Sequence, residues 1–564
     1  MCDVKYTETD MTSRHGGKIL ADQLAIQGVD RVFSVPGESF LAALDGLYDS
    51  GIQNVVCRQE GGAAMMAEAH GKLSGTPGVL FVTRGPGATN ASSGIHVAMQ
   101  DSTPMVIFVG QIDIGHRDRE AFQEVDYKRF FSPLAKWVAE VDHTDRLPEY
   151  IARAFQIAQS GRPGPVVLAL PENMLSAEAD IQDRPKVRIA SQTATNRDAH
   201  SIAKTLAEAE RPLIIAGGSG WSAAAQDDLQ TFATAWDVPV AVSFRRQDYM
   251  DNRHACYAGD LNVGISPALA ARMQQADCLL VLGARLGDIS TAGYTLLDPA
   301  AHGKTLLHVH PDPDEPGHIY APDIAVAARS SSMLTQLVSL TPPARPMWAA
   351  WRKTARAEYE AWLTPKETPG PVKMEQIVPW LSDTLPGDAI LTNGAGNYAA
   401  FLHRYFTYKQ MHTQLAPTSG SMGYGFPAAI SAKLKHPDRD VICFAGDGCF
   451  QMTCNEMSTA IQHDAAVIVI VVNNGKYGTI RMHQEKNYPA RVSGTQIANP
   501  DFAALARSYG GWGGTVTRTE DFAATFEEAR AAKTLAVIEL QLDDEVLSTG
   551  MTVSETRAVG QSPS

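Results

Sequence analysis

The chain has 564 residues, 44% of them hydrophobic and 20% charged, which is too long for one hydrophobic core and too apolar for a largely disordered protein. Its 48 Lys and Arg against 62 Asp and Glu give a formal net charge of −14, and an acidic surface repels phosphate backbones, so we expect no nucleic-acid partner. The longest apolar run, residues 465–472, is too short to span a bilayer, and the polar N-terminus lacks the apolar core of a signal peptide. The seven cysteines form no CxxC pair, which favours reduced thiols. We therefore expect a cytoplasmic protein with no membrane partner.

Short apolar runs alternate with helical patterns along the whole chain. The runs are residues 78–83, 104–110, 165–170, 212–218, 278–284, 440–446 and 467–472. Near-continuous apolar strands separated by helices indicate parallel sheets covered on both faces. The predicted fold class is therefore α/β.

Polar, proline-containing stretches interrupt this pattern at residues 176–198 and again between 340 and 372. They divide the chain into blocks of ordinary domain size. We predict three doubly wound parallel-sheet domains, over residues 1–183, 190–345 and 365–545. The tail, residues 548–564, is polar, and we expect it to be partly mobile.

A motif in the third block points to chemistry. "DVICFAGDGCF" is typical of a strand, a glycine turn and a helix start, and 24 residues (449–472) separate its Gly-Asp-Gly from Asn473-Asn474 at the end of the next apolar strand. Because the carboxyl ends of parallel strands meet at one edge of a sheet, Asp447 and Asn474 should present oxygen atoms to one point. Such donors beside a glycine turn suit Mg²⁺ holding a diphosphate. Either half alone would be an ordinary turn or strand end.

The motif resembles the signature of thiamine-diphosphate-dependent enzymes. Residues 58–90, 102–111, 121–126 and 420–430 resemble in particular the acetolactate synthase-like branch. The resemblance implies a pyrimidine-binding N-terminal domain, a central domain and a diphosphate-binding C-terminal domain. It also implies active sites shared between two copies of the chain, in a homodimer or a homotetramer.

In the C-terminal block, the resemblance implies that the Asp447 and Asn474 side chains and the Lys476 carbonyl bind Mg²⁺. Met422 matches the residue that wedges the cofactor into a bent conformation, and Gly420 would offer its carbonyl to the aminopyrimidine. The synthases carry Gln-His where this chain has Asn397 and Tyr398. The remaining implied cofactor contacts are Ala395, Gly396, Asn397, Gly446, Gly448, Cys449, Tyr477 and Gly478.

In the N-terminal block, the resemblance implies that Glu60 is catalytic. By position alone, a Glu at a helix start would only complement the helix dipole. In the family, this carboxylate hydrogen-bonds the pyrimidine N1′ and favours the tautomer that removes the thiazolium C2 proton, after which the cofactor takes up the electrons of a decarboxylating 2-oxo acid. The implied cofactor contacts in this block are Val35, Pro36, Gly37, Glu60, Thr83, Pro86 and Asn90.

Other positions match substrate-facing residues. Phe122, Gln123 and, less closely, Lys136 match residues near the reacting carbon. Helical spacing after Asn474 should place Ile480 and either His483 or Gln484 on one face, and we expect Lys136, Ile480 and His483 in the substrate pocket. The synthases have a Trp at the position of His483, and the adjacent His pair of pyruvate and indolepyruvate decarboxylases is absent. Glu38, in "VPGESF", replaces the second glycine of the synthase loop, where pyruvate decarboxylases carry an acid. It is a catalytic candidate or simply the first residue of a helix.

We predict decarboxylation of a 2-oxo acid, dependent on thiamine diphosphate and Mg²⁺, with ligation of the resulting enamine to a second carbonyl acceptor. The alternatives are a C–C lyase on a 2-hydroxy ketone or 2-hydroxyacyl thioester, a sulfoacetaldehyde acetyltransferase, an FAD-dependent pyruvate oxidase-like enzyme and a non-catalytic binding protein. The glycine-containing stretches "IIAGGSGWS" and "VLGARLGDIST" of the central block leave FAD binding and a purely structural domain both open.

Overall fold

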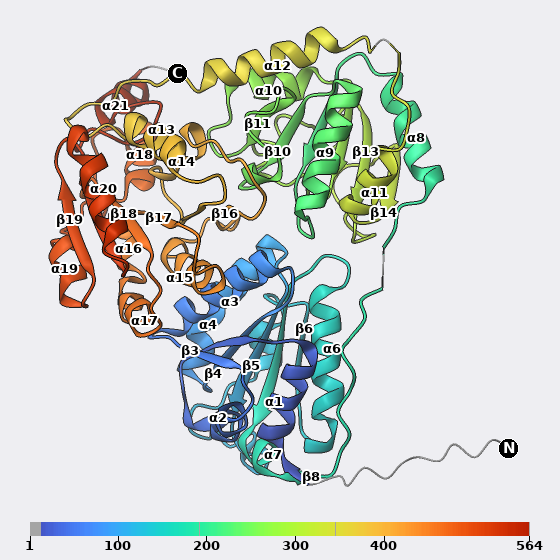
Figure 1. Ribbon diagram of the computed structural model, residues 1–564, viewed down its shortest axis with the longest axis vertical. Helices are drawn as coiled ribbons and strands as arrows, with labels where there is room; N and C mark the ends of the chain where they lie inside the picture. Colours follow the sequence, from blue (N-terminus) through green and yellow to red (C-terminus); the bar gives the residue numbers. More distant parts are fainter. Residues whose placement is uncertain (1–12, 191, 345, 563–564) are drawn as a thin grey trace. The chain divides into compact units, whose positions relative to one another are not determined.

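The computed structural model describes residues 13–190, 192–344 and 346–562, and Cys2 and most of the polar N-terminus lie outside them. Three six-stranded sheets follow one another along the chain, each flanked by helices (Figure 1). Every strand pairing within these sheets is parallel. The predicted α/β class is confirmed. No helix of the described residues is both long and apolar enough to cross a membrane.

Two compact units contain these sheets, Met1–Ala190 with the first sheet and Ser191–Ser564 with the other two. The first sheet has the order β3-β2-β4-β5-β7-β6. Its strands are β2 Arg31–Ser34, β3 Gln53–Val56, β4 Gly78–Val82, β5 Met105–Gln111, β6 Trp137–Glu140 and β7 Pro165–Pro171. Its helices are α1 Gly16–Gln27, α2 Leu41–Tyr48, α3 Glu60–Ser74, α4 Pro86–Asp101, α5 Tyr127–Phe131, α6 Leu147–Gln159 and α7 Glu172–Ser176. A separate antiparallel pair joins β1 Arg14–His15 to β8 Glu178–Ala179.

The central sheet has the order β11-β10-β9-β12-β13-β14. Leu213 and Ile215 of β9 pack into one apolar cluster and Ile214 and Ala216 into another, so both faces of the sheet are buried. The strands are β9 Pro212–Ala216, β10 Val240–Ser243, β11 Tyr257–Leu261, β12 Cys278–Leu282, β13 Thr305–His310 and β14 Ile324–Ala327. The helices are α8 Asn196–Ala207, α9 Ala223–Trp236, α10 Pro267–Gln275, α11 Ser330–Leu337 and α12 Ala349–Trp362.

The third sheet has the order β16-β15-β17-β18-β20-β19, with β17 and β18 at its centre. Its strands are β15 Ile390–Asn393, β16 Gln414–Leu415, β17 Val441–Gly446, β18 Ile468–Asn473, β19 Trp512–Val516 and β20 Ala536–Gln541. Its helices are α13 Met374–Thr384, α14 Ala399–Tyr405, α15 Gly425–Lys435, α16 Asp447–Gln451, α17 Met457–Gln462, α18 Gly478–Asn487, α19 Phe502–Ser508, α20 Phe522–Ala531 and α21 Val553–Gln561.

All seven apolar runs identified in the sequence form strands, namely β4, β5, β7, β9, β12, β17 and β18. Six cysteines lie among the described residues, and all six are free thiols. The polar tail contains a helix that the sequence did not predict, and its partial mobility stays a prediction. Residues 553–561 form α21, whose first turn is closed by a capping box between Thr552 and Glu555.

Candidate active site

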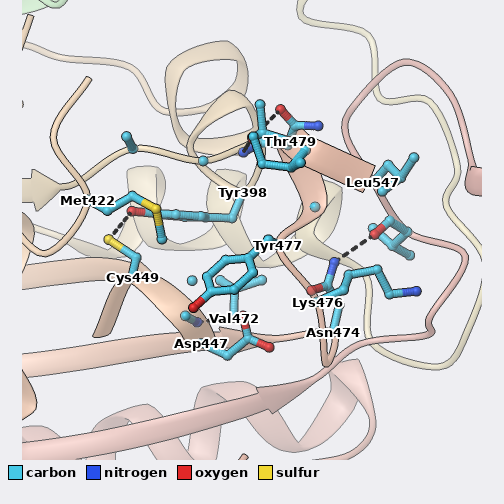
Figure 2. Close-up of a pocket in the computed structure, with 18 of the residues that line it drawn as sticks. Tyr398, Met422, Asp447, Cys449, Val472, Asn474, Lys476, Tyr477, Thr479 and Leu547 are labelled. Atoms are coloured by element: carbon cyan, nitrogen blue, oxygen red, sulfur yellow. Dashed lines mark hydrogen bonds between the residues drawn. The ribbon is translucent and has the colours of Figure 1, made fainter. Parts of the chain in front are cut away.

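A cavity of about 250 Å³ lies at the carboxyl edge of the third sheet (Figure 2). Every cofactor and metal residue predicted in this part of the chain lines it, and so does Ile480. The lining also includes residues that the sequence did not single out: Tyr398, Phe401, Val472, Thr479, Leu542, Val546 and Leu547. The structure therefore brings the predicted set together, and the roles assigned to its members stay predictions.

Asp447 and Asn474 come to this edge because their strands are neighbours. β17 and β18 pair in register, with Gly446 opposite Val472, so the residues after each strand end side by side. The Asp447 carboxylate is buried and accepts from the backbone N–H groups of Gly448 and Gly475, at 2.8 Å each. Burial raises the pKa of Asp447, and these donors oppose the shift.

The Asn474 side chain is oriented by the C-terminal segment. Its amide nitrogen donates to the Val546 carbonyl at 3.0 Å (Figure 2). Because the two polar atoms of a carboxamide diverge from one carbon, this bond leaves the oxygen as the atom available to a cation. Asp447 and Asn474 thus supply two hard oxygen donors of the kind that Mg²⁺ prefers.

The Lys476 carbonyl is directed by a short antiparallel contact. The Tyr477 N–H donates to Thr495 and the Ile497 N–H to Gly475, at 2.9 and 3.0 Å, so Lys476 bridges to Gln496 as a non-hydrogen-bonded pair. In such a pair, each residue's own N–H and C=O point away from its partner. The Lys476 carbonyl is therefore free of this ladder, as its predicted role requires.

Two aromatic rings cover the glycine turn, so the turn has no room for side chains. A β-carbon on Gly446 would lie 2.8 Å from the Tyr398 ring, and one on Gly448 would lie 2.6 Å from the Tyr477 ring. The Tyr398 hydroxyl accepts from the Gly394 N–H at 3.1 Å and donates to the Cys449 sulfur at 3.3 Å (Figure 2). Burial raises the pKa of the Cys449 thiol, which keeps it protonated as a packing group.

The Met422 loop is held from the central sheet. Arg245, which follows β10 in the left-handed backbone region (φ 59°), donates to the Pro417 carbonyl at 2.5 Å. A β-carbon added to Gly420 would have no atom of the described residues within 4 Å, so the cavity is open over this glycine. The open space beside Met422 is where the resemblance places the cofactor.

The C-terminal helix α21 docks on α18, the helix that carries Ile480. Buried Glu485 of α18 binds Arg481 of the same helix at 2.8 Å and Arg557 of α21 at 2.8 Å. A β-carbon on Gly560 of α21 would lie 2.3 Å from the Glu485 carbonyl, so the two backbones touch. The hydrogen bond from Arg557, with help from Arg481, lowers the pKa of Glu485 to about 2.

This ion-pair set predicts a pH-dependent stability. The folded pKa of Glu485, about 2, lies below that of an unfolded Glu, about 4.3, so its stabilisation is complete above the unfolded value and is lost as the pH falls toward 2. We expect Glu485→Gln to lower the Tm at neutral pH, and the difference from wild type to shrink below about pH 4. Thermal unfolding followed by circular dichroism measures both; a Tm difference independent of pH would contradict the assignment.

Glu60 is the first residue of α3 in the N-terminal unit, and its side chain is buried. Asn90 of α4 donates to its carboxylate at 3.0 Å, and a β-carbon on Gly87 would lie 3.3 Å from its other oxygen. The neighbouring Gln59 caps the helix by accepting from the Gly62 N–H at 3.0 Å. The helix cap is thus made by Gln59, which leaves the Glu60 carboxylate for another purpose.

Glu38 begins a 3₁₀ turn, Glu38–Phe40, ahead of α2, and its carboxylate has a partner that the sequence did not reveal. Buried Arg84, just after β4, binds Glu38 at 2.9 Å and Glu172 at 2.9 Å. A β-carbon on Gly37 would lie 2.3 Å from that of Thr83, and the Ser39 and Thr83 hydroxyls are 2.9 Å apart. The "VPGESF" loop therefore lies directly on the loop after β4.

Gln123 lies against the same loop in an uncommon conformation. Its φ is 65°, in the left-handed region, and a β-carbon on Gly85 would lie 2.7 Å from that of Gln123. The Gly85 N–H donates to the Tyr127 hydroxyl at 2.8 Å, which fixes this contact. Phe122, next to it, is 74% exposed in the single chain.

The remaining substrate candidates are distributed unevenly. Ile480 lines the pocket from α18, whereas His483, one turn further along, is exposed and does not line it. The Lys136 ammonium donates to the carbonyls of Ile157 and Ser160 at 2.6 Å each, which complements the C-terminal end of α6. These contacts favour a structural role for Lys136.

Within residues 13–190, 192–344 and 346–562, no group of three or more His, Cys, Asp or Glu side chains is placed to hold a metal. The predicted Mg²⁺ ligands at the third sheet do not form such a group, because only Asp447 among them is one of these four residue types. The other two ligands are the Asn474 carboxamide and the Lys476 backbone carbonyl. A chain of three parallel sheets, with a glycine-lined cavity beside these oxygen atoms, has the architecture of an enzyme that uses a diphosphate-containing cofactor.

Comparison with known proteins gives the family. Residues 14–130 match the N-terminal TPP binding domain of thiamine pyrophosphate enzymes, residues 199–337 the central domain and residues 394–540 the C-terminal TPP binding domain. The acetolactate synthase large subunit of Corynebacterium glutamicum is 30% identical over 91% of this chain and 84% of its own length. Those of Lactococcus lactis and Parasynechococcus marenigrum are 31% and 32% identical, over 88% and 90% of this chain and 87% and 84% of their own lengths. The chain belongs to the thiamine pyrophosphate enzymes, in the group that contains the acetolactate synthase large subunits.

Proposed function

We propose that the protein decarboxylates a 2-oxo acid and joins the remaining carbon unit to a second carbonyl compound, using thiamine diphosphate and Mg²⁺. The observation that carries this proposal is the pocket of the third sheet. There, the Asp447 carboxylate and Asn474 carboxamide lie at the ends of adjacent strands, in a domain of the matching family.

The residues present fit the cofactor and its metal. Asp447, Asn474 and the Lys476 carbonyl form an all-oxygen donor set, and Gly446 and Gly448 line the same cavity. The cavity, about 250 Å³, is slightly smaller than the roughly 300–1,000 Å³ of a complete ligand pocket, as expected if this domain holds one end of the cofactor. When bound, thiamine diphosphate supplies the electron sink that decarboxylation needs.

Different residues of the chain shape the pocket, bind the metal and contact the pyrimidine ring. Met422 and the Tyr398 and Tyr477 rings shape the apolar wall, while Asp447 and Asn474 anchor the metal. The Glu60 carboxyl group is buried at a helix start, where it can form a hydrogen bond with a pyrimidine nitrogen. Asn90 orients that carboxylate.

The assembly that we propose is a homodimer or a homotetramer in which two copies complete each site, as the family resemblance implies. The names of the relatives as large subunits say that those proteins assemble with a further chain. Light scattering of the purified chain measures its oligomeric state. A fully active monomer would contradict the shared site.

For the central domain we infer a structural role rather than FAD binding. β9 and β12 flank the point where the strand order reverses, which is the usual nucleotide crevice of this topology. There, a β-carbon on Gly218 would lie 1.8 Å from the Gly283 carbonyl, and the buried Trp221 ring packs tilted against Tyr249, with ring centroids 5.0 Å apart. The Tyr249 hydroxyl and Arg246 both donate to the Gly218 carbonyl, at 2.7 and 3.0 Å. A flavin absorbance spectrum in the purified protein would contradict this inference.

Glu38 is the residue that we expect to influence the fate of the decarboxylated carbon unit. Its carboxylate is largely exposed while it pairs with Arg84. We expect Glu38→Gln to change the ratio of released aldehyde to ligated product and to leave the cofactor affinity close to wild type. The measurement is product analysis with a panel of 2-oxo acids, with and without aldehyde acceptors.

Glu172→Gln is the matched control, because Glu172 binds the other side of the Arg84 guanidinium. If both variants change the product ratio equally, the effect comes from Arg84 and not from Glu38. If Glu38→Gln leaves the products unchanged, Glu38 is only the first residue of its helical turn.

A further inference from the structure

Asn499 lies between the loop of residues 493–497 and α19, outside every motif considered above. Its amide nitrogen donates to the Asp447 carboxylate at 2.7 Å and to the Asn473 side-chain oxygen at 2.8 Å. Its own side-chain oxygen accepts from Gln451 of α16 at 2.8 Å. These three polar contacts all reach residues at the ends of β17 and β18 or in the helix after β17.

These contacts join the two strand ends that carry the predicted metal ligands. Asp447 directly follows β17, and Asn473 is the last residue of β18 and the neighbour of Asn474. Asn473 is fixed in turn, because its amide donates to buried Glu539 of β20 at 2.7 Å. The Asn499 amide thus joins Asp447 to the end of β18, beside the Gly475 N–H, which also donates to both residues, at 2.8 and 3.1 Å.

The contacts also distinguish the two oxygens of Asp447. Oδ2 accepts from both Asn499 and the Gly475 N–H, whereas Oδ1 accepts from the Gly448 N–H. A carboxylate oxygen with two N–H donors has little capacity left for a cation. The Asn499 amide therefore fixes the rotation of the carboxylate and leaves Oδ1 as the oxygen with capacity for the metal.

We propose that Asn499 is a positioning residue of the metal site, which holds Asp447 and Asn474 at the spacing that Mg²⁺ requires and so favours Mg²⁺ over larger cations. The inference rests on the proposed function, since it assumes that the metal site is used. Mg²⁺ needs near-octahedral oxygen ligands at about 2.0–2.1 Å, whereas Ca²⁺ accepts flexible geometry at about 2.3–2.6 Å. Loss of the positioning group should therefore weaken Mg²⁺ binding more than Ca²⁺ binding.

The competing explanation is that Asn499 only stabilises the chain entering α19. Asp501 provides the matched control, because it lies two residues away and caps α19 by accepting from the Ala504 N–H at 2.8 Å. Removing that cap loosens the same segment by about 1 kcal/mol without touching Asp447. If Asn499 had only this structural role, substitution of Asn499 and substitution of Asp501 would affect cation binding equally.

The experiment compares wild type with Asn499→Leu, which keeps the branching of the side chain and removes the amide, and with Asp501→Ala. Mg²⁺ or Ca²⁺ is titrated by calorimetry into metal-free protein that contains excess thiamine diphosphate, and circular dichroism checks the fold. We expect Asn499→Leu to raise the Kd for Mg²⁺ by roughly 10–100-fold, the range usual for partners of metal ligands, and the Kd for Ca²⁺ by less than about threefold. Asp501→Ala should leave both close to wild type.

Equal weakening of both cations, no weakening of either, or an equal effect of Asp501→Ala would each overturn the proposal. If Asn499→Leu is unfolded, Asn499→Ala takes its place, and unfolding of both variants would make Asn499 a structural residue and the proposal wrong. If wild type itself binds neither cation with thiamine diphosphate present, the proposed function fails first, which is distinguishable from a failure at Asn499 alone.

Discussion

Glu60→Gln is expected to lower turnover by about 10²–10⁴-fold, the contribution usual for a positioned proton-transfer group. The amide keeps the volume of the side chain and can still accept from Asn90, so the packing at the start of α3 should survive. It cannot carry the negative charge that stabilises a protonated pyrimidine nitrogen. Steady-state kinetics measures the loss, and solvent deuterium exchange of the cofactor C2 proton should slow in parallel.

Gln59→Ala is the control for local disturbance at this helix. Gln59 caps α3 immediately before Glu60, and loss of such a cap costs roughly 1 kcal/mol of stability. We expect this variant to have a lower Tm and nearly normal turnover. Full activity of Glu60→Gln would remove Glu60 from the reaction.

Asp447→Asn is the second change with a large expected effect. It removes the only charged side chain of the oxygen set, so Mg²⁺-dependent binding of thiamine diphosphate should weaken by more than the roughly 10–100-fold typical of residues behind the ligands. Without ligand the variant should still fold but with a lower Tm than wild type, because both carboxylate oxygens accept N–H groups and the nitrogen of the new amide can accept none. Treatment of wild type with a chelator should mimic the variant, and added Mg²⁺ should restore activity.

Thermal unfolding separates the effect of Asp447→Asn on cofactor binding from its effect on the stability of the ligand-free fold. A ligand that binds only the folded state raises Tm, so wild type should gain stability when cofactor and Mg²⁺ are added together. The variant should start from a lower Tm than wild type and gain little when cofactor and Mg²⁺ are added. A full cofactor-dependent rise in the variant would show that Asp447 does not hold the metal.

The sequence predicts the parts of this molecule that local patterns determine. Buried strands of a parallel sheet are continuous apolar runs, so the ends of β17 and β18 could be located from the sequence alone. Asp447 and Asn474 follow these two ends, and their proximity could therefore be predicted. Glu60 could be placed at a helix start for the same reason.

Contacts between distant segments could not be predicted in this way. Arg84 lies 46 positions from Glu38, and no pattern in the sequence around either residue predicts their ion pair. Val546 and Leu547 line the pocket because α21 docks on α18 through Glu485 and Arg557, a tertiary contact that no motif marks. Asn499 likewise reaches Asp447 across 52 positions.

The proposed function is tested by CO2 release from a panel of 2-oxo acids. The release is measured with the wild-type chain in the presence and absence of thiamine diphosphate and Mg²⁺, with and without a carbonyl acceptor. We expect CO2 release that requires both thiamine diphosphate and Mg²⁺, together with a ligated product. CO2 release that persists without thiamine diphosphate, or no release from any 2-oxo acid by protein that has bound both, would contradict it.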